Sequence, residues 1–244
     1  MLRHRGKRRT FVHNLKLASL LSFVAGVVNI TGVLHMKVLT TNVTGHFAYF
    51  AEELSLRHFG IAFAFLLFIF SFLAGSFLSN LLTEWTINRK WQMIYALPMS
   101  LEIVVIAGVC LMYFDEQPIG NSRLVLSCGL LFAMGVQNSL VTKASQSVVR
   151  TTHLTGLFTD LGIELSQLFF YKEKGVFKKL TKNIYLKLAI IGFFFTGCVL
   201  GGLVYKSFQL HTLWIAVAVL LSATLYDSVR FWYYNLKRKV QNRF

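Results

Sequence analysis

Long apolar runs separated by short polar segments recur along the whole chain. Six runs approach or exceed the roughly 20 residues that an α-helix needs to cross a bilayer. They are Leu15–Leu34, Phe59–Leu82, Met93–Tyr113, Leu124–Val141, Ile184–Tyr205 and Phe208–Tyr226. The second run contains no charged residue, and the first contains only Lys16 near its edge. The pattern predicts an all-α integral membrane protein, a polytopic helical bundle with six spanning helices.

The composition excludes a soluble globular domain. Of the 244 residues, 55% are hydrophobic and only 14% are charged, whereas soluble domains carry about 25% charged residues. The three cysteines, Cys110, Cys128 and Cys198, lie inside apolar runs without a CxxC pair or a histidine at metal-ligand spacing. The sequence also lacks a phosphate-binding glycine loop, a GxSxG motif and an HExxH motif. We therefore expect no metal, no cofactor and no enzymatic activity.

The net charge of +15 has two explanations. The opening residues, MLRHRGKRRTFVHNLK, have the composition of an arm that binds nucleic acid, but basic tails beside membrane helices also mark the cytoplasmic side. We favour the second explanation and expect no nucleic-acid partner. The first apolar run exceeds the roughly 7–15 residues of a signal-peptide core and lacks a clear cleavage site. We expect it to remain as the first helix.

Two stretches of the chain repeat each other. TTNVTGHFAYFAEELS at 40–55 and TTHLTGLFTDLGIELS at 151–166 share eight of sixteen residues. Upstream, GVVN at 26–29 matches GVQN at 135–138, and downstream Phe72, Gly75 and Leu78 match Phe194, Gly197 and Leu200. Duplication is the economical explanation. The predicted organisation is a basic tail (1–14), a first membrane repeat (15–113), a second repeat (124–226) and a basic tail (227–244).

Neither motif segment is a convincing crossing. Only fourteen uncharged residues lie between Lys37 and Glu52, and the second copy contains Asp160 and Glu164. The start of each segment is β-branched and polar, and helical spacing of apolar residues follows. We expect an extended lead-in and then a short helix with Thr44 or Thr155 near its N-cap.

Loop charges favour re-entrant motif segments. If both segments dip in and return on one side, five basic groups share the inside with both tails: Arg89, Lys90, Lys143, Arg150 and the lysine-rich segment 171–183, which we expect to form a loop. Asp115 and Glu116 then lie outside, as the positive-inside rule prefers. The two repeats are then inverted, a construction found in many secondary transporters. The alternative is eight crossings with a parallel repeat.

The two motif regions carry a family resemblance. GVVNITGVLHMKVLTTNVTG at 26–45 and AMGVQNSLVTKASQSVVRTTHLTGLFTDLG at 133–162 resemble signatures of the YoaK family of bacterial membrane proteins, domain of unknown function 1275. The resemblance covers roughly residues 15–226. It implies a multi-pass protein of the bacterial inner membrane, of undefined activity, and the loop charges place both termini in the cytoplasm. Asn29 stands where the family pattern has an acidic residue, and His46 where it has asparagine.

The motifs are the candidate substrate site. The free N–H groups and positive dipole end of a short helix favour an anion, and two such helices from opposite faces point to one place. The candidate residues are Asn29, Thr41, Thr44, Gly45, Asn138, Arg150, Thr152, Thr155 and Gly156. Two structural explanations remain open: small residues let membrane segments pack closely, and asparagines form hydrogen bonds between helices.

Other polar residues suggest further roles. Glu102 lies in the middle of an apolar run, where an ionisable group is costly and is a functional candidate by default. Proton coupling is one role, and a protonated carboxyl hydrogen-bonded to another helix is the alternative. Pro98 predicts a kink nearby. Three carboxylates at the far ends of the short helices, Glu53, Asp160 and Glu164, are expected to pair with Arg57, Lys143 or the lysine-rich segment.

The sequence thus predicts a small secondary transporter or channel for an anionic solute. A non-transporting membrane scaffold or accessory subunit is the alternative. The expected partners are membrane lipids and a small anionic solute, and a homo-oligomer is compatible with the sequence.

Overall fold

The computed structural model describes residues 10–89, 91, 93–112, 121–145, 149 and 151–241. Every regular element within these ranges is helical. They are α1 (Phe11–Met36), α2 (Val43–Ser55), α3 (Phe59–Asn88), α4 (Ala96–Leu111), α5 (Asn121–Ser145), α6 (Leu154–Phe170), α7 (Lys174–Phe208), the short 3-10 helix η2 (Gln209–Thr212) and α8 (Leu213–Gln241). The prediction of an all-helical protein is confirmed.

Helix length and composition support fewer crossings than the apolar runs predict. Four described segments are long and apolar enough to span a membrane: Phe11–Met36, Phe59–Asn88, Ser122–Ser145 and Lys174–Tyr226. The last has 53 residues and contains α7, η2 and the start of α8. Helix α4 has only 16 residues, fewer than the roughly 20 of a typical crossing. Six crossings therefore stay a prediction.

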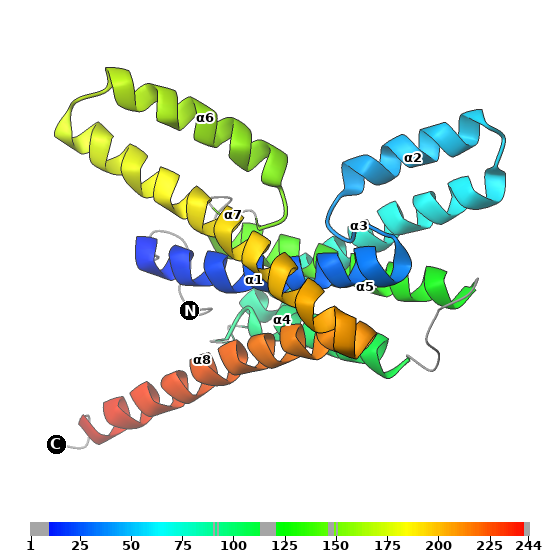
Figure 1. The fold of residues 1–244 in the computed structure, drawn as a ribbon. Coiled ribbons are helices and arrows are strands. Elements are labelled where there is room, and N and C mark those ends of the chain that lie inside the picture. Colours follow the sequence, from blue (N-terminus) through cyan, green and yellow to red (C-terminus); the bar gives the residue numbers. More distant parts are fainter. Residues whose placement is uncertain are drawn as a thin grey trace.

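Helices α1 and α5 form the centre of the fold. Helix α7 packs across α1, and α3 packs across α5 (Figure 1). Helix α4 packs on α5 and α8, and α8 also contacts α1. The apolar parts of α1 and α5 are mostly buried, whereas few residues are buried in those of α3 and α7. Exposed phenylalanines such as Phe63, Phe77 and Phe195 suit helices that face lipid.

Four glycines allow the two close helix crossings. A Cβ at Gly26 would collide with the carbonyl oxygen of Phe194, and one at Gly197 with that of Phe23. The other crossing has the same construction: Gly135 lies against the carbonyl oxygen of Phe72, and Gly75 against that of Phe132. Glycines at such positions let membrane helices approach to backbone contact. Matched positions of the sequence repeat therefore form matched contacts.

Side chains beside these glycines also correspond. The Cys198 thiol donates to the Gly26 carbonyl at 3.4 Å, and the Ser76 hydroxyl donates to the Gly135 carbonyl at 3.1 Å. Cys198 and Ser76 each follow directly after a crossing glycine. Each crossing thus has a polar contact at the same place, and the crossing of α3 and α5 has a second one, from the Ser79 hydroxyl to the Val136 carbonyl at 3.0 Å.

Two helical hairpins project from the centre. We call them the motif hairpins: α2 with the start of α3, and α6 with the start of α7. Figure 1 shows α2 running from the middle toward the right, where α1 also ends, while α6 runs toward the upper left. Since α2 packs mainly on α3 and α6 on α7, most of the surface of these short helices is exposed.

Two local predictions were wrong. The lysine-rich segment after the second motif is mostly not a loop, because α7 begins at Lys174 and continues to Phe208; lysine and leucine are good helix formers, and no proline interrupts them. Pro98 does not sit at a mid-helix kink. It is the third residue of α4, where its missing N–H is one that would have no intrahelical partner.

Candidate substrate-binding site

Asn29 and Asn138 hold the two motif lead-ins against the central helices. The Thr41 hydroxyl donates to Asn29 Oδ1 at 3.1 Å, and the Thr152 hydroxyl donates to Asn138 Oδ1 at 3.1 Å. Asn29 lies seven residues before the end of α1, and Asn138 seven residues before the end of α5, which is about 10 Å of helix. Thr41 and Thr152, just before the two short helices, therefore lie about this far back along α1 and α5.

Buried threonines strengthen these ties. Thr40 and Thr151, at matched positions, are both fully buried. The Thr40 hydroxyl lies 3.5 Å from Asn29 Oδ1. In the second copy, Gln137 Nε2 donates to the Leu21 carbonyl at 2.8 Å and lies 3.4 Å from the Thr151 hydroxyl. Gln137 thereby connects α5 to α1 and to the second lead-in.

The two short helices begin with a side chain folded over a glycine. Asn42 is the N-cap of α2, and its Oδ1 accepts a hydrogen bond from the Gly45 N–H at 3.0 Å. His153 is the N-cap residue of α6. A Cβ at Gly45 would press on the Asn42 side chain, and one at Gly156 on the His153 ring. A nearby side chain therefore gives a steric reason for each glycine. At Gly45 that side chain is held by a cap hydrogen bond, whereas the His153 side chain makes none.

The predicted cap residues lie inside the helices instead. Thr44 and Thr155 are the second residues of α2 and α6, and both are exposed. They belong to the first turn of each helix, where the N–H groups have no intrahelical partner. They are accordingly placed to contact a molecule at the helix start without being needed for the cap.

His46 has a structural role in the first motif. Its ring is buried, and Nε2 is hydrogen-bonded to the Leu39 carbonyl at 2.8 Å. The ring also lies against Phe65 and Phe68 of α3. His46 thus fastens the lead-in to the hairpin, whereas His153 is exposed. The described residues contain no group of three or more histidine, cysteine, aspartate or glutamate side chains that would bind a metal.

Glu102 lies apart from the motif hydrogen bonds, in α4. Arg150 lies outside the described residues, as do Asp115 and Glu116. Glu102 is fully buried in α4, which packs on α5, α8 and α3. Neither of its carboxyl oxygens has a hydrogen-bond partner among the described residues. This observation speaks against the hydrogen-bonded structural alternative for Glu102.

Two of the three carboxylates, Glu53 and Glu164, form ion-pair-range contacts with residues other than those predicted, although Glu164 also contacts Asn183 at the end of the lysine-rich segment. Glu53 contacts the His58 ring at 2.9 Å, and Glu164 pairs with Lys187 at 2.6 Å and accepts from Asn183. The partner of Glu53 is His58 and not the predicted Arg57, because the turn between α2 and α3 places the His58 ring against the end of α2. Lys187 lies in the spanning part of α7, beyond the lysine-rich segment. Each of these contacts joins the two helices of one motif hairpin.

Known proteins match this chain over most of its length. A family model described as a protein of unknown function, DUF1275, matches residues 17–226. The chain belongs to the DUF1275 family. It is 25% identical over 207 residues to the UPF0700 transmembrane protein YoaK of Bacillus subtilis (strain 168), which covers 84% of this chain and 89% of that relative. No solved structure matches.

The DUF1275 match includes the features described above. Both motif hairpins, both glycine crossings and Glu102 lie within residues 17–226. Most of the two basic tails lies beyond the match. The transmembrane relative and the apolar helices together identify an integral membrane protein, and the family is one of unknown function.

Sequence reasoning missed three residues of this DUF1275 protein that shape the site. Asn42 was identifiable as the cap because it stands three residues before Gly45, the spacing of an N-cap bond. His46 and Lys187 were not identifiable, because their partners, the Leu39 carbonyl and Glu164, are set by how the chain folds back.

Proposed function

We propose that this DUF1275 protein is a small secondary transporter or channel for an anionic solute. The observation that carries the proposal is the pair of lead-ins that double back along α1 and α5, each held by an asparagine–threonine bond of 3.1 Å. Non-helical backbone at membrane depth is tolerated where it is buried in protein or lines a water-filled cavity. Exposed Thr44 and Thr155 then offer hydroxyl and N–H groups to an anion. The proposed activity involves no enzymatic step.

The proposed topology has six crossings, two re-entrant motif segments and an inverted repeat, with both termini in the cytoplasm at the bacterial inner membrane. Helix length supports it, since the 13 residues of α2 extend about 20 Å, less than the roughly 30 Å hydrocarbon core. Helix α6 is longer, with 17 residues, but contains Asp160 and Glu164. Matched contacts at the two glycine crossings agree with two related halves.

A cysteine at Arg57 tests this topology. Arg57 lies in the turn between α2 and α3 and is exposed. In a background without Cys110, Cys128 and Cys198, Arg57→Cys is expected to react with an impermeant maleimide from outside the cell. A crossing α2 places it in the cytoplasm, so labelling only after membrane disruption contradicts the re-entrant arrangement. Lys172→Cys is the control, because it is cytoplasmic in both arrangements.

Transport itself is tested in proteoliposomes. We expect uptake of at least one member of a panel of inorganic and carboxylate anions. Thr44→Val and Thr155→Val are each expected to reduce apparent affinity for that anion about tenfold, the effect of losing one hydrogen bond to a charged group. Because both threonines are exposed, thermal stability is expected to stay unchanged. Thr159→Val, also exposed on α6, is the matched control.

A non-transporting scaffold remains the second candidate. Two observations favour it. Asn29 and Asn138 accept hydrogen bonds from threonines of the same protein, and side chains of Asn42 and His153 lie against Gly45 and Gly156. Absence of uptake across the anion panel, together with a stoichiometric partner that copurifies from membranes, supports the scaffold and overturns the transporter.

A further inference from the structure

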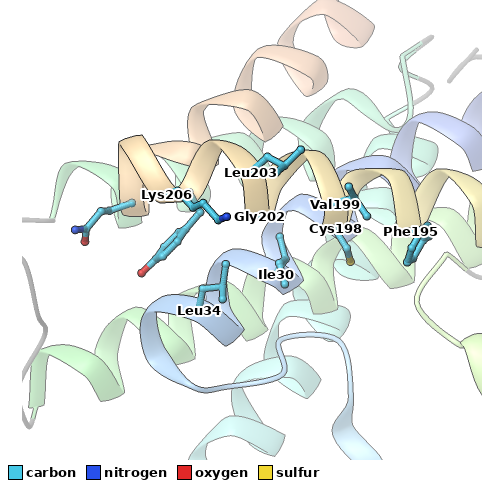
Figure 2. A pocket seen from close by; sticks show the side chains of 10 residues that line it. Ile30, Leu34, Phe195, Cys198, Val199, Gly202, Leu203 and Lys206 are labelled. Atoms are coloured by element: carbon cyan, nitrogen blue, oxygen red, sulfur yellow. The ribbon is translucent and has the colours of Figure 1, made fainter.

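A groove of about 860 Å³ runs between α1 and the second half of α7. Figure 2 shows Ile30 and Leu34 of α1 on one side, and Phe195, Cys198, Val199, Gly202 and Leu203 of α7 on the other. The volume lies in the range of small-molecule sites, about 300–1,000 Å³. The groove lies on the exposed side of α7, so in the membrane its open side faces lipid.

Polarity changes from one end of the groove to the other. The lining is apolar from Phe195 to Leu203, whereas Tyr205, Lys206 and Gln209 gather at the far end, next to η2. Lys206 is exposed, and the described residues provide no carboxylate within ion-pair distance of it. An apolar trough that ends in a cation matches a molecule with one apolar tail and an anionic head.

Local contacts keep this groove open and define its floor. A Cβ at Gly202 would lie 3.5 Å from Ile30, at ordinary contact distance, so glycine there leaves room that a larger side chain would fill. At the polar end, the His35 ring and the Tyr205 hydroxyl share a hydrogen bond of 3.0 Å that joins α1 to α7. The groove is therefore built from fixed helices.

We propose that this groove binds one acyl chain of an anionic glycerophospholipid, with the lipid phosphate at Lys206. The groove follows α7 from Phe195 to Gln209, about 21 Å of helix. One leaflet contributes about 15 Å to a hydrocarbon core of roughly 30 Å, so an acyl chain and its glycerol linkage fit the length. Lysine at the membrane surface attracts anionic headgroups. The proposal does not depend on transport.

Native mass spectrometry of the purified full chain tests the proposal. The delipidated protein is titrated with dioleoyl phosphatidylglycerol and, separately, with dioleoyl phosphatidylcholine, which has the same tails and no net charge. We expect one phosphatidylglycerol adduct per chain, bound at least about tenfold more tightly than phosphatidylcholine. Lys206→Ala is expected to abolish this difference, and Gly202→Leu to weaken both lipids by filling the groove.

Two matched controls share helix α7. Lys179→Ala removes the same charge from an exposed position, and Gly192→Leu adds the same side chain where nothing lies within 4 Å. Both are expected to bind phosphatidylglycerol as the wild type does. Equal binding of the two lipids to the wild type overturns the headgroup assignment. Unchanged lipid binding in Gly202→Leu, or an equal loss of binding in Gly192→Leu, overturns the groove as the binding site. If Gly202→Leu misfolds, Lys206→Ala still tests the proposal, because Lys206 is exposed.

Discussion

Gly135→Ala is expected to lower the free energy of unfolding by about 3 kcal/mol, the upper part of the range for overpacking. The added methyl group would meet the Phe72 carbonyl oxygen and the Ser76 backbone. Backbone atoms cannot rotate away as a side chain does, so α3 and α5 must separate. Gly26→Ala is expected to have the same effect on α1 and α7, because Gly26 meets Phe194 in the same way.

Gly108→Ala is the matched control for these variants. Gly108 lies inside α4 with no atom within 4 Å of an added Cβ, so alanine there is expected to stabilise the protein by about 0.5–1 kcal/mol through helix propensity. The measurement is the thermal denaturation midpoint in detergent. The same glycine-to-alanine change is thus expected to lower the midpoint at Gly135 and to raise it at Gly108. A Gly135→Ala protein as stable as the wild type contradicts the close crossing.

The main helices were predictable because their cause is local. Each long apolar run predicts a helix through its own composition, and α1, α3 and α5 formed where the pattern predicted them. Charge misled the prediction after the second motif, where lysines suggested a loop although helix propensity continues into α7. The pairing of the helices was not predictable. Gly26 and Gly135 indicate that another helix can approach closely, but a glycine does not indicate which helix that is.

The candidate site was only partly predictable for the same reason. Repetition of the motif predicted that Asn29 and Asn138 have matched roles, and their equal bonds to Thr41 and Thr152 agree with this. Their side-chain oxygens accept hydrogen bonds from residues of the same protein, and a single sequence does not reveal this. Thr44 and Thr155 stay candidate substrate-binding residues, because no cap hydrogen bond among the described residues involves their hydroxyls.

Glu102→Gln is expected to reduce proton-driven anion uptake to the level of liposomes without protein. Glu102 is fully buried, and neither carboxyl oxygen has a hydrogen-bond partner among the described residues. An ionised carboxylate in such a place costs several kcal/mol. A glutamate at this depth is therefore a candidate for binding and releasing a proton during transport. Glutamine keeps the shape and cannot exchange that proton. Solute counterflow without a pH gradient is expected to persist, because it requires no net proton movement.

Glu102→Leu separates this function from stability. Removing an unpaired buried polar group is expected to raise the free energy of unfolding by about 1–3 kcal/mol, while proton-driven uptake is lost as in Glu102→Gln. A structural glutamate predicts the reverse, a less stable leucine variant with uptake reduced only as far as folding is impaired. Gradient-driven uptake at the wild-type rate in Glu102→Gln excludes proton coupling through this residue. Since the stability measurement needs no substrate, it tests the unpaired state of Glu102 independently of transport.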